Sequence, residues 1–137
     1  MSQPLPIKAL HHIARTTSDP ERSRAFYRDV LGFREIRRPG FNFRGAWLFN
    51  YGVQIHIIEH DTGGPAGDID TRAEHLAFAV DEFAEVERRL AEHGIEYHKQ
   101  VNAGGIPQIF FHDPDGHHIE IGIYPPTPPY LDTEAHW

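Results

Sequence analysis

Residues 110–123, Phe-Phe-His-Asp-Pro-Asp-Gly-His-His-Ile-Glu-Ile-Gly-Ile, carry the clearest structural signal in this chain. The Asp-Pro-Asp-Gly sequence at 113–116 is typical of a turn, because proline presets one backbone dihedral and glycine accepts a positive φ. The residues after it alternate as in a half-buried strand, with Glu120 on one face and Ile119 and Ile121 on the other. The stretch therefore predicts a β-hairpin that carries a carboxylate on its polar face.

A similar hairpin pattern occurs earlier in the chain, in residues 47–58, Trp-Leu-Phe-Asn-Tyr-Gly-Val-Gln-Ile-His-Ile-Ile. Gly52 precedes His56 by four residues, as Gly116 precedes Glu120. Three pairs of landmarks are separated by a nearly constant 62 to 64 residues: His12 and His75, Gly32 and Gly94, His56 and Glu120. This constancy predicts an internal duplication in which the order strand, helix, strand, strand, strand occurs twice.

The duplication predicts an α+β fold made of two tandem βαβββ modules, which form a cupped mixed sheet with the helices outside. Four segments follow from it: a first module at 7–60, a glycine-rich linker at 61–73, a second module at 74–124 and a proline-rich tail at 125–137.

The helix ends carry their own signals. Asp19 is the expected N-cap of the first helix, since proline follows it at the first helical position. Asp81 is the expected N-cap of the second helix, and glycines at positions 32 and 94 are expected to end the two helices in the left-handed conformation.

Composition limits the class of function. The chain has 137 residues, a formal net charge of −7 and no cysteine, which disfavours binding to nucleic acid or anionic membranes and excludes thiolate sites. No apolar leader or membrane-spanning run is visible, so we expect a cytoplasmic protein that acts on a small molecule. The basic cluster of the chain is Arg34, Arg37, Arg38 and Arg44. We read Arg37, Arg38 and Arg44 as a solvated edge, with binding of an anionic substrate as the alternative.

Eleven histidines in so short a chain make a metal site worth testing. The repeat pairs His12, rather than His11, with His75, and strand parity then places His12, His56, His75 and Glu120 in the concavity of the cup. A lone strand histidine is more often a core or surface residue than a ligand, but three histidines and one glutamate at repeat-equivalent positions reverse that expectation. Three imidazoles and one carboxylate suit a catalytic site for a divalent ion such as Zn, Ni, Co, Fe or Mn.

Further residues can be assigned from the same parity. Three of them share the ligand face and are candidates to line the substrate: Thr16, Gln54 and Ile58. The remaining histidines are expected to face solvent: His11, His60, His93, His98, His112, His117, His118 and His136.

These features resemble the vicinal oxygen chelate superfamily of glyoxalases, bleomycin resistance proteins and extradiol dioxygenases. The resemblance covers roughly residues 7 to 124 and is carried by the doubled element order, by Phe-Tyr-Arg-Asp-Val-Leu-Gly-Phe at 26–33 and by the turn at 113–116 before Glu120. Residues 38–56 are similar to the small glyoxalase I-like proteins of plants and bacteria. The resemblance implies bidentate binding of neighbouring substrate oxygens to a metal held by His12, His56, His75 and Glu120.

The sequence departs from characterised glyoxalase I at one ligand, because bacterial enzymes carry glutamate where His56 stands. Glu120 is then the carboxylate among the four that can take a proton from a carbon next to a carbonyl. We therefore predict Glu120 and His56 as catalytic residues of a divalent-metal-dependent lyase or isomerase of the glyoxalase I (lactoylglutathione lyase) type. Its expected substrate is a small chelating hydroxycarbonyl compound or thiol adduct.

Two alternatives stay open. An extradiol-type dioxygenase would need non-haem Fe(II) held by two histidines and one carboxylate, which His12, His75 and Glu120 could supply. A non-catalytic drug-sequestering protein would use the cavity without turnover. A homodimer is expected because relatives often share the cup between chains, so that His12 and His56 of one chain would meet His75 and Glu120 of another.

Overall fold

The computed structural model describes residues 3–61 and 67–125. Part of the predicted linker and nearly all of the predicted proline-rich tail therefore lie outside the described residues. In the part that is described, no helix has the length and apolar character needed to cross a membrane.

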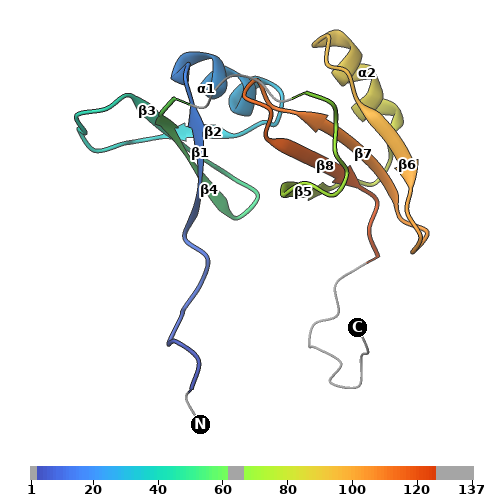
Figure 1. The fold of residues 1–137 in the computed structure, drawn as a ribbon, viewed down its shortest axis with the longest axis horizontal. Helices are drawn as coiled ribbons and strands as arrows, with labels where there is room; N and C mark the ends of the chain where they lie inside the picture. Colours follow the sequence, from blue (N-terminus) through green and yellow to red (C-terminus); the bar gives the residue numbers. More distant parts are fainter. Residues whose placement is uncertain (1–2, 62–66, 126–137) are drawn as a thin grey trace.

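The described residues form ten elements in two sets. The first set is β1 His12–Thr17, α1 Pro20–Asp29, β2 Arg34–Ile36, β3 Gly45–Asn50 and β4 Val53–Glu59. The second set is β5 His75–Ala79, α2 Ala84–Glu92, β6 His98–Val101, β7 Pro107–His112 and β8 His118–Gly122. This order confirms the predicted α+β class with two βαβββ modules, which lie side by side in Figure 1.

Each module contributes one four-stranded mixed sheet, with strand orders β1-β4-β3-β2 and β5-β8-β7-β6. In both sheets the first strand is parallel to the last, and the other neighbours are antiparallel. The registers also repeat, because Ala14 lies opposite His56 in the first sheet and Ala77 lies opposite Glu120 in the second. The duplication read from sequence spacing is therefore present in the strand pairing itself.

Helix α1 begins where the sequence predicts. The carboxylate of Asp19 accepts a hydrogen bond of 3.1 Å from the backbone N–H of Arg22, which satisfies one of the unpaired amides at the helix start. Gly32 and Gly94 have φ of 80° and 67°, which confirms the left-handed residues expected after the two helices.

The predicted start of α2 was wrong, because Asp81 is not its N-cap. The N-cap residue is Phe83, whose side chain is 8% exposed and makes no capping hydrogen bond. The carboxylate of Glu82 instead accepts a hydrogen bond from the backbone N–H of Glu85. Burial of the Phe83 ring in the core sets this helix start. Tertiary packing thus overrides the local capping signal.

One apolar core joins the two modules. Phe26 of α1 lies 6.4 Å from Phe111 of β7, measured between ring centroids, and Phe33 lies 6.1 Å from Phe78 of β5. Phe26, Phe33 and Phe111 belong to a continuous buried cluster that also includes Ile55 and other residues from the central strands of both sheets, and Phe78 packs against it. The modules therefore meet through the apolar faces of their strands and through α1.

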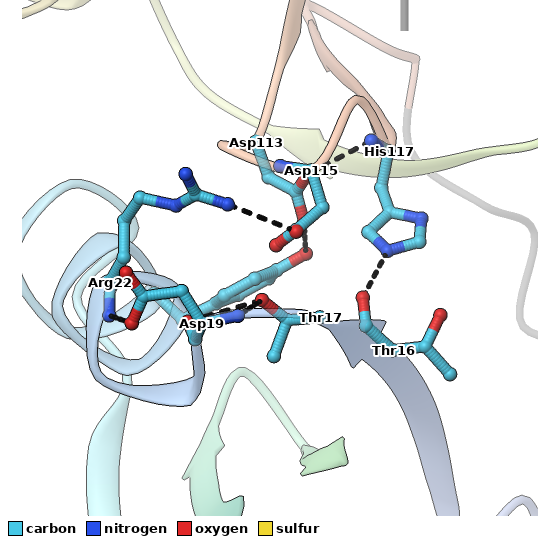
Figure 2. A network of polar contacts seen from close by, with 8 residues as sticks. Thr16, Thr17, Asp19, Arg22, Asp113, Asp115 and His117 are labelled. Carbon is cyan, nitrogen blue, oxygen red and sulfur yellow. Dashed lines mark hydrogen bonds and ion pairs between the residues drawn. The ribbon is translucent and has the colours of Figure 1, made fainter. Parts of the chain in front are cut away.

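A buried polar network ties the turn at 113–116 to the first module (Figure 2). The carboxylate of Asp113 is 3% exposed and accepts three hydrogen bonds, from the backbone N–H groups of Asp115 and His117 at 2.9 Å and from the hydroxyl of Tyr27 at 2.8 Å. Arg22 donates to the Asp115 carboxylate at 3.1 Å. Gly116, with φ of 85°, closes the turn.

A further contact crosses between the modules at the same place. Nε2 of His117 lies 2.9 Å from the carbonyl oxygen of Thr16, and because a carbonyl only accepts, the imidazole donates. The turn that the sequence singled out thus fixes the second hairpin against both β1 and α1.

The Tyr27 hydroxyl predicts a weakening of the fold in alkali. Burial, and then the charge and hydrogen bond of Asp113, raise the pKa of Tyr27 well above its ordinary value of 10.0. A raised folded-state pKa contributes stability that is present below pH ~10 and is lost as pH rises above it, because only the unfolded chain can ionise there. Above pH ~10 we expect the urea midpoint to fall more steeply for the natural chain than for Tyr27→Phe. If the urea midpoints of the two proteins fell equally steeply with pH, the raised pKa of Tyr27 would be contradicted.

Candidate metal centre

The first pair of candidate ligands is a stack of rings on β1 and β4. The imidazoles of His12 and His56 lie 4.0 Å apart between centroids with an interplanar angle of 11°, and Trp47 stacks on His56 at 4.1 Å and 6°. Gln54 makes a hydrogen bond of 3.0 Å with Nε2 of His56. Burial, and then the nearby charges of His12, His11 and Arg38, lower the pKa of His56. The neutral imidazole, which is the form that binds metals, is therefore favoured.

The second pair lies at the equivalent place on β5 and β8. Nε2 of His75 is 3.3 Å from Oε1 of Glu120, and Glu120 is 5% exposed. Nδ1 of His75 lies 2.8 Å from the carbonyl oxygen of Ala73, and because a carbonyl only accepts, Nδ1 carries the hydrogen. Nε2, the other ring nitrogen, then faces the carboxylate. An imidazole oriented through its second nitrogen by a backbone carbonyl is typical of metal ligands.

Two donors hold the Glu120 carboxylate in place. Gln108 of β7 donates to Oε1 at 3.0 Å, and the hydroxyl of Tyr124 donates to Oε2. Burial, and then the hydrogen bond to Glu120, raise the pKa of Tyr124, so the phenol stays protonated as a donor. A Cβ at Gly122 would collide with the Tyr124 ring, so this position must be glycine for the ring to lie beside Glu120.

Within one chain the structure brings together each pair but not all four residues. Among residues 3–61 and 67–125, no three His, Cys, Asp or Glu side chains are grouped so that they could hold a metal ion. The expectation that all four converge is thus not met inside a single chain. The reason lies in the strand faces, because Ile55 and Ile119 point into the shared core while His56 and Glu120 lie on the opposite faces.

The donor chemistry of each half nevertheless fits a divalent ion. Each half presents two groups that can bind metal, two imidazoles in one and an imidazole with a carboxylate in the other, and no thiolate is present. A complete set requires both halves to meet.

The three predicted substrate-lining residues lie on the face that carries His12 and His56. Gln54 contacts His56 directly, and Thr16 lies opposite Ile58 in the register of β1 and β4. Their role toward a substrate stays a prediction.

Sequence reasoning missed several contacts of the ligand pairs. One of them is the stack of Trp47 on the His56 ring, which crosses the β3–β4 pair. Gln108 and Tyr124 were not singled out, although the strand parity that places Glu120 also places Gln108 on its face. The expectation of solvent-facing rings was wrong for His117 and His118. His117 is half-buried and donates to the Thr16 carbonyl, and His118 is 9% exposed and its Nε2 accepts a hydrogen bond of 2.9 Å from the backbone of Asp70.

A groove of about 840 Å³ lies between the modules on their apolar side. Its lining includes Ile13, Leu76 and Phe78, and none of the four candidate ligands. The chemistry therefore points to the opposite faces of the sheets.

The fold and these ligand pairs agree with a match to a known family. Residues 9–121 match the model of the Glyoxalase/Bleomycin resistance protein/Dioxygenase superfamily, so the chain belongs to this family.

Individual relatives give the same picture. The chain is 41% identical over 125 residues to Glyoxylase I 4 of Arabidopsis thaliana, which covers 86% of this chain and 72% of the relative. It is 30% identical over 125 residues to lactoylglutathione lyase of Salmonella typhimurium, covering 84% of this chain and 91% of the relative. The crystal structure of a glyoxalase family protein from Bacillus anthracis superposes with a TM-score of 0.71 at 26% identity, covering 88% and 98%.

Proposed function

We propose that this protein is a divalent-metal-dependent lyase or isomerase of the glyoxalase I type, acting on a small chelating hydroxycarbonyl compound or thiol adduct. The observation that carries the proposal is the contact between Nε2 of His75 and the buried Glu120 carboxylate, with His12 and His56 at the repeat-equivalent place. The names of the relatives from Arabidopsis and Salmonella support this type of reaction.

In this proposal the metal ion is held by His12, His56, His75 and Glu120 and would be Zn, Ni, Co, Fe or Mn. When bound, it supplies Lewis acidity for neighbouring substrate oxygens.

A second copy of the chain completes the site in this proposal. Strands β1 and β5 are edges of their sheets, and an unpaired edge is a template for pairing with another chain. The ligand face of both edges is open, because Ala14 and Ala77 are exposed beside the candidate ligands. Leu5, Ile7 and Leu10, just before β1, are 78%, 77% and 73% exposed. Pairing of β1 with β5 of a second copy would cover this apolar segment and bring the two ligand pairs together.

The role of Glu120 in the proposal is to take a proton from the substrate carbon next to a carbonyl and return it at the neighbouring carbon. Its buried carboxylate is positioned by Gln108 and Tyr124, so little rearrangement is required before proton transfer. His56 contributes no negative charge, which leaves Glu120 as the base of this set.

Purification with the native metal tests the function. We expect a stoichiometric divalent ion by elemental analysis and isomerisation of the methylglyoxal–glutathione hemithioacetal. Oxygen uptake with catechols in place of isomerisation would favour the extradiol dioxygenase. Absence of both activities and of metal would favour a sequestering protein.

Mixing two inactive variants tests the shared site. We expect His12→Ala/His56→Ala and His75→Ala/Glu120→Ala each to lose metal and activity, because each removes one complete ligand pair. If the site is shared between chains, a mixed dimer contains one intact site out of two. Half of the dimers are mixed after the two variants are combined, partly unfolded and refolded, so the mixture should regain up to about a quarter of the natural activity. Mixing each variant with itself is the control. A site formed within one chain would give no recovery.

A further inference from the structure

Aromatic rings continue outward from the His12–His56 stack. Trp47, which stacks on His56, lies 6.1 Å from Phe41, measured between ring centroids, and Phe41 stacks on Phe43 at 5.2 Å with an interplanar angle of 23°. Phe41 and Phe43 are 45% and 40% exposed. Trp47 thus links two exposed phenyl rings to the candidate ligand pair, and exposed aromatic rings form an apolar surface that a bound molecule could cover.

A guanidinium lies over this surface. The Cζ of Arg38 is 4.8 Å from the ring centroid of Phe41 and 5.0 Å from that of Phe43, and its Nη2 donates to the carbonyl oxygen of Phe43 at 2.9 Å. These contacts fix the side chain while using one of its five N–H donors. Stacking on aromatic faces is a favourable way to hold a guanidinium in place.

Arg38 has no carboxylate partner within 4.0 Å in the part of the chain that is described, whereas neighbouring Arg44 is paired with Glu59. A half-buried cation that is held in place and has free donors is complementary to an anion. We name the residues Arg38, Phe41, Phe43 and Trp47 the aromatic rim.

We propose that the aromatic rim binds a planar aromatic or conjugated carboxylate, with its flat part on Phe41 and Phe43 and its carboxylate on the guanidinium of Arg38. Stacking selects a flat molecule, and the guanidinium selects the charge. If the proposed function holds, this group is the part of the substrate that extends from the chelating oxygens, and the substrate class becomes a chelating compound with a conjugated acid substituent.

Binding of three matched probes tests the proposal by calorimetry on the protein as purified and after treatment with a chelator. Cinnamate has both features, cinnamamide lacks the charge and 3-cyclohexylpropanoate lacks the flat ring. We expect cinnamate to bind about tenfold more tightly than either of the others, as for one charge-assisted hydrogen bond or one aromatic stack. The affinity should survive the chelator, because the rim needs no metal.

Variants assign the affinity to the rim. Arg38→Gln should abolish the difference in affinity between cinnamate and cinnamamide. Arg37→Gln, at a neighbouring exposed position, should retain that difference. Phe41→Leu/Phe43→Leu should remove the preference for the flat acid. Calorimetry measures binding without turnover. A negative result in the hemithioacetal assay would therefore count against the proposed function and not against binding at the aromatic rim.

Four results would overturn the proposal. They are equal affinities for cinnamate and its amide, loss of binding on chelation, the same effect from both arginine variants, and a changed sedimentation coefficient in Arg38→Gln, which would make the rim a protein interface.

Discussion

Replacement of Asp113 by alanine is expected to lower the free energy of unfolding by about 3 kcal/mol or more. The carboxylate is buried and accepts hydrogen bonds from the Tyr27 hydroxyl and from the backbone of Asp115 and His117. Alanine would leave three donors without their acceptor, and an unsatisfied buried polar group costs about 1 to 3 kcal/mol. Urea unfolding of the metal-free protein measures the change without contributions from metal binding.

Two milder variants are the controls for this effect. Asp113→Asn keeps an acceptor oxygen for the two backbone donors and should cost clearly less than alanine. Tyr27→Phe removes one donor rather than the shared acceptor, and we expect a loss of about 1 kcal/mol. A cost for Asp113→Ala no larger than that for Tyr27→Phe would mean that the network does not hold the modules together.

Replacement of Glu120 by glutamine is expected to lower kcat for hemithioacetal isomerisation by about 10² to 10⁴-fold, the range typical of a lost general base. Glutamine has nearly the same size and can still contact Gln108 and Tyr124 after rotation of its amide, so the fold should be retained. The basic group would be lost. Steady-state kinetics with reconstituted metal, together with the metal content of the variant, separates loss of the base from loss of the ion.

Glu87→Gln is the matched control for this substitution. Glu87 lies on α2 and pairs with Tyr97 and Lys99, away from both ligand pairs. The kcat of the Glu87→Gln variant should therefore stay within about twofold of the natural value. A Glu120→Gln variant that binds metal and keeps full activity would remove Glu120 as the base.

Local chemistry was enough to predict most of the fold from sequence. Asp19 before proline starts α1 because its carboxylate satisfies a free amide, and the glycine at 116 supplies the positive φ of the hairpin. Strand alternation separated Ile119 from Glu120, and the repeat offset paired His12 with His75. These features depend on residues close in sequence or on a duplication visible in the spacing.

Long-range contacts decided the rest. Burial of Phe83 sets the start of α2. The hydroxyl of Tyr124 reaches Glu120 because Gly122 leaves room for the tyrosine ring. Trp47 stacks on His56 across the β3–β4 strand pair.

Spacing and strand alternation are enough to tell which residues form each βαβββ module and which strand face carries each candidate ligand, because both properties are local. The meeting of the modules through their apolar faces depends instead on contacts between residues far apart in the chain. Burial of Phe26 against Phe111 and of Phe33 against Phe78 turns the faces with His56 and Glu120 away from the shared core, so the two pairs of candidate ligands stay apart within one chain.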